Sequence, residues 1–440
     1  MQFKTLGLAL CALLLSACSD SSSTKNFTGT LRFATFHVDM AYDNSQGYNQ
    51  LLGELSAPAA QQPERLRNLA AVIQQRYQER QPDVLLLTGF STDMLGEVAD
   101  DTAIRLFQEN YLAVAQGPDL DPISYSHYLV ATTNSGFRMS GHDVNGDGRE
   151  GQLPEDAQGR GHFHGQDAFV LLSKYPLDAG NARTFRDFKW QDVNQAVKPN
   201  HADGSAMDQN TWEAMSVMST NFVDVAMRLP DGRQISLLAT QLESQWPRDG
   251  SDYSDFHHKR NGAQLRFITD YISSKSSDAD YLVDDEGRRG GVNLSRPFVL
   301  MGNLNNDEDH YAKTVTVGER QSHRLNNGAM AQMLTYSELL RYNGNVNYDP
   351  NTPGSTAGDL YAGQTDSNHY HPLVWTGLYG ARMDYVLAHN DLSIAGSGIF
   401  WPLDGEDGFQ WFYDAEGQPD PALSSHQRLV WVDIDFGRSK

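Results

Sequence analysis

Short apolar runs bounded by turn residues recur along the chain, and they predict β-strands. The expected strands are residues 31–38, 83–87, 167–172, 222–229, 234–239, 297–301, 383–387 and 429–434. Between two of these runs lies the sequence Pro-Asp-Gly-Arg, residues 230–233, which is typical of a hairpin turn. The chain is therefore expected to contain many strands, some of them paired in hairpins.

Two segments instead show the periodicity of helices. In residues 63–81 the apolar side chains of Leu69, Ile73 and Tyr77 recur at helical spacing, so one face of this helix is expected to be buried. A second helix is expected at residues 259–274. Strands in hairpins mixed with long helices indicate the α+β class, with packed sheets at the centre and helices outside.

Several segments between the expected elements are long. The longest are residues 94–126, 181–220, 305–335 and 343–378, and loops of this length are usually lids or other functional segments. No Pro/Gly/Ser-rich linker, internal repeat or low-complexity block interrupts the chain. We therefore expect one large domain over residues 30–437 rather than two or three smaller ones.

The first residues have the pattern of an export signal. Lys4 precedes an apolar run that is too short to span a bilayer, and the sequence Leu-Ser-Ala-Cys ends at Cys18. We interpret residues 1–17 as a lipoprotein signal peptide, Cys18 as the lipidated residue and residues 18–29 as a flexible tether. The alternative is an ordinary cleaved signal with a chance cysteine. Ser19, by resemblance to Gram-negative sorting signals, favours the outer membrane, with the domain facing the periplasm or the exterior.

Composition narrows the range of partners. The formal net charge is −22 and no basic run is present, which makes nucleic acid an unfavourable partner because phosphate backbones are held by clustered Lys and Arg. The two cysteines, Cys11 and Cys18, belong to the signal and the anchor, so the mature domain has no disulfide and no thiolate site. The remaining partners are the membrane, through the lipid anchor, and a protein or small molecule that the sequence does not identify.

Seven segments follow one another in an order that resembles the endonuclease/exonuclease/phosphatase superfamily. They are LRFATFH, RQPDVLLLTGF, DAFVLLSKYPL, ISLLATQLES, PFVLMGNLNND, ARMDYVL and LSSHQRLVWVDI, and they extend over residues 31–436. The segments TNSGFRMSGHDVNGDGRE and GSGIFWPLDG are similar to the exported bacterial branch of that family. The resemblance implies a DNase I-like fold, which is a four-layer α/β/β/α sandwich, and metal-assisted hydrolysis of a phosphoester.

The resemblance also implies what the site residues do. In this family a hard divalent cation, usually magnesium, is held by carboxylates and an amide oxygen, and it polarises the phosphate. One histidine, held by a carboxylate, acts as general base or orients the attacking water, and a second helps to bind the phosphate. An Asp and an Asn in a GDxN turn position water and substrate.

Three positions of that pattern match this sequence, and five do not. The matches are Asn305 of the GDxN turn, Asp384 of the DYVL segment and the last histidine, His426. The departures are His37 for the Asn ligand, Gly89 for the metal-binding Glu, Gln241 for the first His, Asn303 for the Asp of GDxN and Ser425 for the Asp before the last His. Because three of these changes remove a carboxylate, we expect the magnesium ligands to be mostly absent and the ancestral activity to be lost or strongly reduced.

The matched residues admit two interpretations. In the first, Asp384 and His426 form a remnant catalytic pair at the mouth of a cleft, with Asn305 beside them. In the second, they make a buried hydrogen bond between two strand ends, because buried polar groups must be paired whatever the activity. A further alternative is a zinc or iron site formed by His37, His426 and Asp384, since imidazole and carboxylate suit those metals.

A second candidate site lies in a loop of its own. Asp143, Asn145 and Asp147 form a D-x-N-x-D-G sequence, in which alternating oxygen side chains and a glycine suit calcium. The twelfth position of an EF-hand loop is Pro154 here, so the full pattern is not present. We expect a structural calcium site of modest affinity, and the alternative is a plain Asx-turn loop.

Two hypotheses of function follow. In the first, the chain is a family member that has lost phosphoesterase activity and serves as a binding or scaffold protein of the cell envelope. In the second, it is an active hydrolase with an altered site that acts on a small phosphoester or a lipid headgroup, with a loop carboxylate such as Asp366 or Glu243 replacing a lost ligand. A DNA-degrading nuclease is disfavoured by the acidic charge and the missing ligands.

Overall fold

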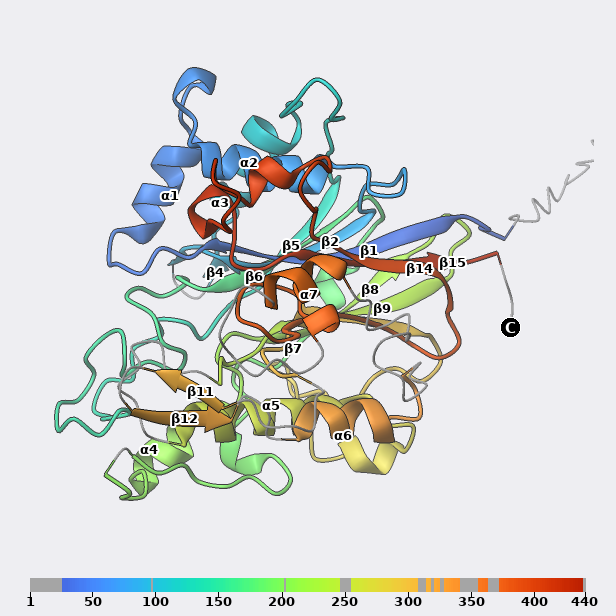
Figure 1. The fold of residues 1–440 in the computed structure, drawn as a ribbon. Helices are drawn as coiled ribbons and strands as arrows, with labels where there is room; N and C mark the ends of the chain where they lie inside the picture. Colours follow the sequence, from blue (N-terminus) through green and yellow to red (C-terminus); the bar gives the residue numbers. More distant parts are fainter. Residues whose placement is uncertain are drawn as a thin grey trace, which may run out of the picture.

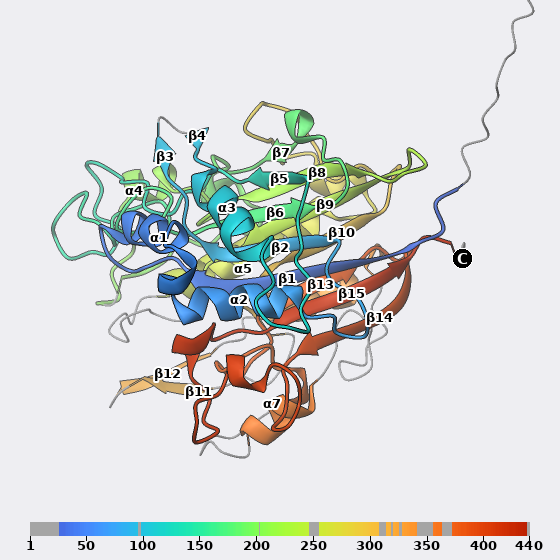
Figure 2. The same cartoon turned by 90° about the horizontal axis from the view of Figure 1, so that it is seen from above.

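Two β-sheets lie face to face at the centre of the molecule, and helices cover their outer faces (Figures 1 and 2). This arrangement belongs to a computed structural model, which describes residues 26–95, 98–201, 203–245, 255–307, 314–317, 320–324, 328–340, 355–362 and 372–437. It is a four-layer α/β/β/α sandwich, so the predicted fold class is confirmed.

The first sheet has six strands in the order β14-β15-β1-β2-β6-β5. Their bounds are β1 Thr30–Met40, β2 Val84–Phe90, β5 His127–Val130, β6 Ala168–Ser173, β14 Ser393–Phe400 and β15 Leu429–Asp435. β1 pairs with β2 in parallel, and the other neighbours are antiparallel. Every residue of β2 and β6 is buried, which explains why both strands are continuous apolar runs.

The second sheet has five strands in the order β13-β10-β9-β8-β7. Their bounds are β7 Arg183–Thr184, β8 Phe222–Arg228, β9 Gln234–Gln241, β10 Phe298–Asn303 and β13 Asp384–Ala388. β9 and β10 run in parallel, whereas β8 and β9 form the predicted hairpin. Each sheet therefore has one parallel pair near its centre, and these two pairs carry most of the site described below.

Three apolar layers hold the sandwich together. Side chains such as Phe33, Leu237 and Val299 fill the space between the sheets. The helices α1 (Gly47–Leu55), α2 (Glu64–Gln74) and α3 (Thr102–Phe107) pack on the outer face of the six-stranded sheet. The helices α4 (Gln209–Ala214), α5 (Phe256–Tyr271) and α6 (Ala329–Tyr336) pack on the outer face of the five-stranded sheet.

The segments expected to be long loops contain further short elements. They are β3 Met94–Leu95, β4 Val98–Ala99, β11 Thr314–Val317, β12 Arg320–Arg324 and α7 Thr356–Ala362. Short helical turns lie at Ala59–Gln61, Gln108–Leu112, Ala179–Asn181, Trp190–Asp192, Ser276–Ala279, Pro372–Val374, Phe409–Trp411 and Pro421–Leu423. The segments 94–126 and 181–220, expected as long loops, thus contain α3, α4 and several of these turns.

The predicted helix 63–81 is shorter than its apolar pattern suggested. It ends at Gln74, because Gln75 has an extended conformation and Gln78 and Glu79 have positive φ angles. The side chain of Gln74 also turns back to hold the carbonyl groups of residues 111, 112 and 114. Tyr77, the last apolar position of the pattern, instead packs its ring on Trp431 of β15.

The last residues of the expected tether 18–29 belong to the folded body. The Phe27 N–H donates to Asp231 Oδ2 at 2.7 Å, and the Phe27 ring contacts those of Tyr175 and Phe436. The described chain thus begins beside its C-terminal end, on one side of the molecule (Figure 1).

The predicted signal peptide and Cys18 lie outside the described residues. Within the described ranges, no helix has the length and apolar character that crossing a bilayer requires.

Candidate functional site

The polar residues singled out in the sequence collect at one edge of the sandwich. The strand register places His37 beside Thr88 in the six-stranded sheet, and it places Gln241 and Asp384 on either side of Asn303 in the five-stranded sheet. The two sheets meet at this edge, because the Gly89 N–H donates to Gln241 Oε1 at 2.6 Å. Parallel strands whose ends meet in this way explain why residues far apart in the sequence form one site.

On the six-stranded side the central group is the imidazole of His37. Its Nδ1 lies 3.1 Å from Thr88 Oγ1, and its Nε2 lies 3.1 Å from Asp39 Oδ1. The ring covers Gly89, since a Cβ built on that glycine would lie 2.6 Å from His37 Cε1. Gly89 has a φ of +67°, a conformation that glycine adopts without strain. The backbone and the ring together make glycine the residue that fits here.

Asp39 is shared between two histidines, and sequence reasoning missed it. Besides His37, its carboxylate accepts from the His426 N–H at 2.9 Å and from Ser425 Oγ at 2.9 Å, and it lies 3.1 Å from His426 Nδ1. Asp39 has a φ of +50°, which is uncommon for a residue with a side chain. The only signal in the sequence was its position two residues after His37.

The charges of this group reinforce one another. Burial acts to lower the pKa of His37, but the carboxylates around it, Asp39 first and then Asp167 and Asp384, outweigh burial and raise that pKa. Burial would likewise raise the pKa of Asp39, yet the two histidines hold it well below its usual range. Both shifts in pKa favour the charged forms of His37 and Asp39, which lie in contact at the end of β1.

His426 lies at the outside of this group. Its side chain is 42% exposed, and its ring stacks on that of Tyr379 with centroids 5.3 Å apart. Its carboxylate partner is Asp39, not Asp384, so the predicted Asp384–His426 contact was wrong. The reason is the positive φ of Asp39, which turns this side chain across the end of the sheet toward Ser425 and His426.

On the five-stranded side, amide groups stand next to buried carboxylates. Gln241 links the two sheets, since its Oε1 accepts from Gly89 and its Nε2 donates to Asp167 Oδ1 at 2.8 Å. Asn303 Nδ2 donates to Asp384 Oδ1 at 2.9 Å, while Asn303 Oδ1 is buried without a partner. Each amide thus hydrogen-bonds a carboxylate that lies beside it.

Asp384 is completely buried, and both of its oxygens accept hydrogen bonds. Oδ1 accepts from Asn303, and Oδ2 accepts from Thr376 Oγ1 at 3.0 Å. Burial raises the pKa of Asp384 to about 6, against the opposing effects of Asn303, His37 and Thr376. A carboxyl group with this pKa takes up a proton near neutral pH. Asp384 and His426 are thus near the same edge but in different hydrogen-bond networks.

Asn305 and Glu243 lie beside the site without reaching its centre. Asn305 Nδ2 donates to the Leu242 carbonyl at 2.9 Å, and its backbone has a φ of +51°. Glu243 is buried and contacts His257 Nδ1 at 3.0 Å and Arg260 Nη1 at 3.3 Å. The side chain of Glu243 is therefore held by α5 rather than free to replace a lost ligand. The other candidate, Asp366, lies outside the described residues.

The predicted calcium loop is closed by its own hydrogen bonds. Asp143 accepts from the N–H groups of Gly146, Asp147 and Gly148. Asp147 in turn accepts from the N–H of Arg149 and pairs with its guanidinium at 2.7 Å, and Asn145 Oδ1 accepts from the Asp147 N–H. This is the geometry of an Asx-turn loop, and a calcium ion at Asp143, Asn145 and Asp147 stays a prediction.

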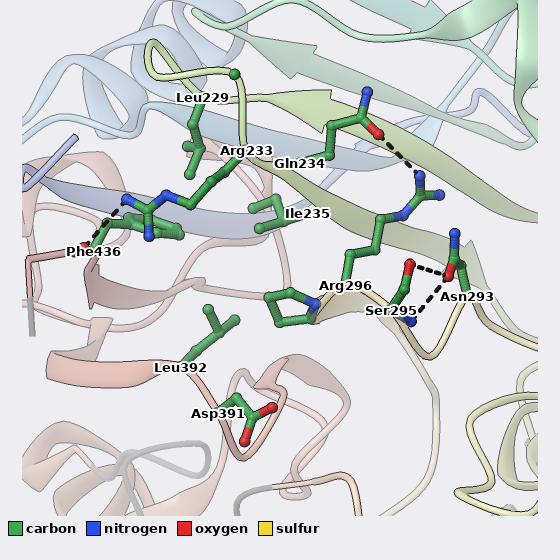
Figure 3. Close-up of a pocket in the computed structure, with 12 residues that line it drawn as sticks. Leu229, Arg233, Gln234, Ile235, Asn293, Ser295, Arg296, Asp391, Leu392 and Phe436 are labelled. Atoms are coloured by element: carbon green, nitrogen blue, oxygen red, sulfur yellow. Dashed lines mark hydrogen bonds between the residues drawn. The ribbon is translucent and has the colours of Figure 1, made fainter. Parts of the chain in front are cut away.

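A separate pocket of about 550 Å³ lies at the opposite end of the strands, where β9 and β10 begin (Figure 3). Arg233 and Arg296 lie on either side of Ile235. Arg233 donates to the carbonyls of Phe27 and Phe436, and Arg296 donates to Ser236 and Gln234. The two guanidinium groups hold neighbouring chain segments in place, so we assign no chemistry to this pocket.

The residues at this edge of the sandwich do not match the ligand set of a magnesium ion. A magnesium site needs several oxygen ligands around one open point. Here the imidazole of His37 covers Gly89, and Asp384, which accepts hydrogen bonds from Asn303 and Thr376, has an amide rather than a second carboxylate beside it. Among the described ranges, no group of three or more His, Cys, Asp or Glu side chains is arranged to hold a metal ion.

Two packed mixed sheets, with polar residues gathered at the ends of their parallel strand pairs, define the class of DNase I-like phosphoesterase folds. A family model described as the Endonuclease/Exonuclease/phosphatase family matches residues 44–426, and the chain belongs to that family. Members of this family typically use divalent metals. No curated protein matches the chain.

Several solved structures are similar to this chain at low identity. An endonuclease/exonuclease/phosphatase from Beutenbergia cavernae is 17% identical, with a TM-score of 0.43 over 93% of this chain and 72% of that one. Sphingomyelinase C from Streptomyces griseocarneus is 16% identical, with a TM-score of 0.41 over 93% and 100%. The human Nocturnin catalytic domain is 13% identical, with a TM-score of 0.38 over 92% and 93%.

Proposed function

We propose that this chain is a cell-envelope member of the family whose cleft has lost metal-dependent phosphoester hydrolysis and now serves to bind a partner. The observation that carries the proposal is the closed network around Asp384. Its two oxygens are taken by Asn303 and Thr376, and Asn303 stands where the family has a carboxylate. A metal ion at Asp384 would find the neutral amide of Asn303 beside it instead of a second charge.

The catalytic side of the cleft supports the same conclusion. Gln241 stands at the position of the first family histidine. Its amide oxygen and its amide nitrogen are both hydrogen-bonded, and an amide does not gain or lose a proton as imidazole does. General base catalysis needs a group that accepts a proton in the transition state. With Gln241 in place of this histidine and Asn303 in place of the Asp of the GDxN turn, the site lacks two of the groups with which the family mechanism moves a proton or positions water and substrate.

The test is a substrate screen of the mature chain. Phosphomonoesters, phosphodiesters and DNA are each assayed with magnesium, manganese or calcium, and we expect no turnover above that of an Asp384→Asn, His426→Ala double variant. Turnover that falls when His426→Ala is introduced, and that survives in Asp391→Ala at the opposite end of the strands, would contradict the proposal.

A second candidate function is an active hydrolase with an altered site on a small phosphoester or a lipid headgroup. The observation that favours it is the Asp39–His426 pair. Nδ1 of His426 faces a carboxylate, and the half-exposed ring leaves Nε2 for a substrate or a water. An Asp–His pair of this kind is a general base without any metal. The screen above separates the two functions, because this one requires turnover that Asp39→Asn and His426→Ala both abolish.

We also propose that the chain is held in the outer membrane by lipid on Cys18, as the N-terminal sequence suggests. The membrane is then one partner, and the second is a protein or small molecule at the cleft. Mass spectrometry of the mature N-terminus and fractionation of the envelope test this proposal. An unmodified Cys18, or a chain found unchanged in the soluble fraction, would contradict it.

A structural calcium ion at Asp143, Asn145 and Asp147 is a separate proposal. It rests on the D-x-N-x-D-G sequence, and it requires Asp143 to exchange backbone N–H groups for the ion. Thermal melting with and without a chelator tests it, with Asp143→Asn as the control that should not respond. An unchanged midpoint in the wild type would contradict it.

A further inference from the structure

The first described residues are held at one end of the sandwich. The Phe27 N–H donates to Asp231 Oδ2 at 2.7 Å, and the Phe27 carbonyl accepts from Arg233 Nη2 at 2.6 Å. Asp231 and Arg233 lie in the turn between β8 and β9, whereas Gln241 of the candidate site lies at the other end of β9. We call the end with Phe27 the anchor end, and the end with Gln241 and Asp39 the site edge.

The two ends are separated by the length of β1. Thr30 pairs with Asp435 at the anchor end, and Asp39 lies at the site edge, where it contacts His37 and His426. At about 3.3 Å per residue, the strand from Thr30 to Asp39 covers about 30 Å. Figure 1 shows this direction, with the start of β1 beside the C-terminal end and α4 on the opposite side of the molecule.

The connections between strands differ at the two ends. At the anchor end, short connections join β8 to β9 and β13 to β14, at residues 229–233 and 389–392. At the site edge, long connections join other strands, at residues 131–167, 185–221 and 401–428. Binding residues are found disproportionately on connections that a rigid scaffold positions. The surface on which a ligand can be bound is therefore concentrated at the site edge, away from Phe27.

The proposed lipid on Cys18 limits how the molecule can lie on a membrane. The chain from Cys18 to Phe27 can extend by at most about 3.6 Å per residue, or about 30 Å in all. That reach is no greater than the distance from the anchor end to the site edge. To turn the site edge onto the membrane, the whole segment would have to run fully extended along the sandwich, and that single conformation gives up nearly all of the conformational entropy of its backbone.

We propose that the site edge faces away from the membrane that holds the lipid, so that the ligand of the site is a water-soluble molecule of the surrounding compartment and not a lipid of that membrane. The inference rests on the proposed lipid anchor and deepens the proposed function, because it narrows the kind of partner at the site. It also divides the second candidate function. A small soluble phosphoester can reach His426 in this orientation, whereas a headgroup of the anchoring membrane cannot.

Energy transfer to the membrane tests the orientation. A dye is placed at either end, on Asp391→Cys in the turn after β13 or on Glu213→Cys of α4, so that each variant loses one exposed acid. With lipid on Cys18, the introduced cysteine is the one reactive thiol of the mature chain. The lipidated variants are placed in vesicles of phosphatidylethanolamine and phosphatidylglycerol that carry an acceptor dye on their headgroups, and Cys18→Ser versions give the background.

We expect transfer from residue 391 to be several-fold stronger than transfer from residue 213, in variants whose circular dichroism matches that of the wild type. A Gly/Ser segment of about twenty residues inserted after Ser23 should remove most of this difference, because the longer tether reaches past the site edge. Equal transfer from the two residues without the insertion, or stronger transfer from residue 213, overturns the inference.

Failure of the inference is distinguishable from failure of the proposed function. A lipidated chain with equal transfer from both ends overturns the orientation alone, and an unmodified Cys18 in the mass spectrum overturns the anchor and the orientation together. Turnover of a soluble phosphoester contradicts the proposed loss of hydrolysis and leaves the orientation standing. Turnover of headgroups in the anchoring membrane contradicts both.

Hydrogen exchange tests the orientation without any substitution. The lipidated wild type is compared in the same vesicles, free of dye, and in detergent micelles. We expect residues 424–427, which include His426, to exchange at the same rate in both, because water reaches the site edge in either case. Slower exchange of these residues in vesicles would mean that the membrane covers the site edge, and the inference would be wrong.

Discussion

The ends of the two sheets differ from the pattern of the family resemblance in different ways. In the six-stranded sheet Gly89 stands where the resemblance implies an acid, and a neighbouring ring, His37, fills the space. In the five-stranded sheet the change is nearly isosteric, since Asn303 differs from an aspartate by one group and keeps a hydrogen bond to Asp384. The first change alters shape and charge together, whereas the second alters charge alone.

The difference bears on how the packing is kept when side chains at the site change. An isosteric change leaves the packing intact, so the strands β10 and β13 keep their full register from Val299 to Asn303. A change that removes a side chain leaves a cavity unless another group fills it. His37 fills it, and Asp39 contacts Nε2 of the ring at 3.1 Å. Four predictions test this contrast.

The largest effect is expected from restoring the acid of the five-stranded sheet. Asn303→Asp places a second carboxylate about where Asn303 Nδ2 now lies, 2.9 Å from Asp384 Oδ1, in a fully buried environment. Without a divalent ion, urea unfolding at pH 8 should show a loss of about 3–5 kcal/mol in the free energy of unfolding. The loss should shrink below pH 6, where the pair shares a proton. A variant as stable as the wild type at pH 8, or Asn303→Ala with the same pH dependence, would contradict this.

A smaller loss is expected at the six-stranded sheet. Gly89→Ala combines a positive φ of +67° with a contact of 2.6 Å to the His37 ring, so it should cost about 2–4 kcal/mol of unfolding free energy. The matched control is Gly287→Ala, which has a φ of +83° and nothing within 4 Å of the added carbon. It should cost only about 1 kcal/mol. Equal losses in the two variants would show that His37 does not fill the site.

The buried acid itself should leave a signature in the pH dependence of stability. The folded pKa of Asp384 is about 6 and lies above the unfolded value. Its contribution to stability is therefore fully present below the unfolded pKa, near 3.9, and is lost as pH rises through about 6, by up to about 3 kcal/mol. Asp384→Asn should remove this part of the slope between pH 4 and pH 6.5 in urea unfolding. A variant with the wild-type slope would show that Asp384 is not the group that titrates.

The smallest effect is expected at Ser425, which lies beside Asp39 and His426. Ser425 Oγ hydrogen-bonds the His37 carbonyl at 2.6 Å and Asp39 Oδ2 at 2.9 Å. Ser425→Ala should cost about 1 kcal/mol of unfolding free energy and leave His426 in place, because Asp39 still holds its N–H and Nδ1. Thermal melting and the His426 ring resonances measure both effects. A large change in the His426 resonances would mean that Ser425, rather than Asp39, orients this ring.

Much of the fold could be predicted from the sequence, because apolar periodicity reports burial directly. Predicted runs coincide with the strands β2, β6, β8, β9, β10, β13 and β15. Nearly all side chains of these strands are buried, so their apolar character is visible in the sequence. Elements with half-exposed side chains, such as β5 and β14, left no such signal. The early end of α2 could not be read either, because backbone angles at Gln78 and Glu79 end it.

The site was predictable in its members but not in its contacts. His37, Gly89, Gln241, Asn303 and Asp384 do lie at one edge, as the resemblance implied. Two further members could not be predicted from the sequence. The role of Asp39 depends on one positive φ angle, and Asp167 reaches the site through the amide of Gln241. Hydrogen-bond partners of this kind depend on angles of a few side chains, and no periodicity encodes them.

The most direct test of the central claim is a manganese titration of the wild-type mature chain, followed through the ring-proton signals of its histidines. A paramagnetic ion bound at the cleft would broaden the signals of His37 and His426 strongly. We predict that both signals keep their width while manganese is raised well above the levels that saturate magnesium-dependent enzymes, because the ring of His37 fills the space beside Gly89 and, among the described residues, no three acidic or histidine side chains are arranged to hold a metal ion. Selective broadening of these two rings at low manganese would show that the cleft still binds a metal, and it would contradict the account.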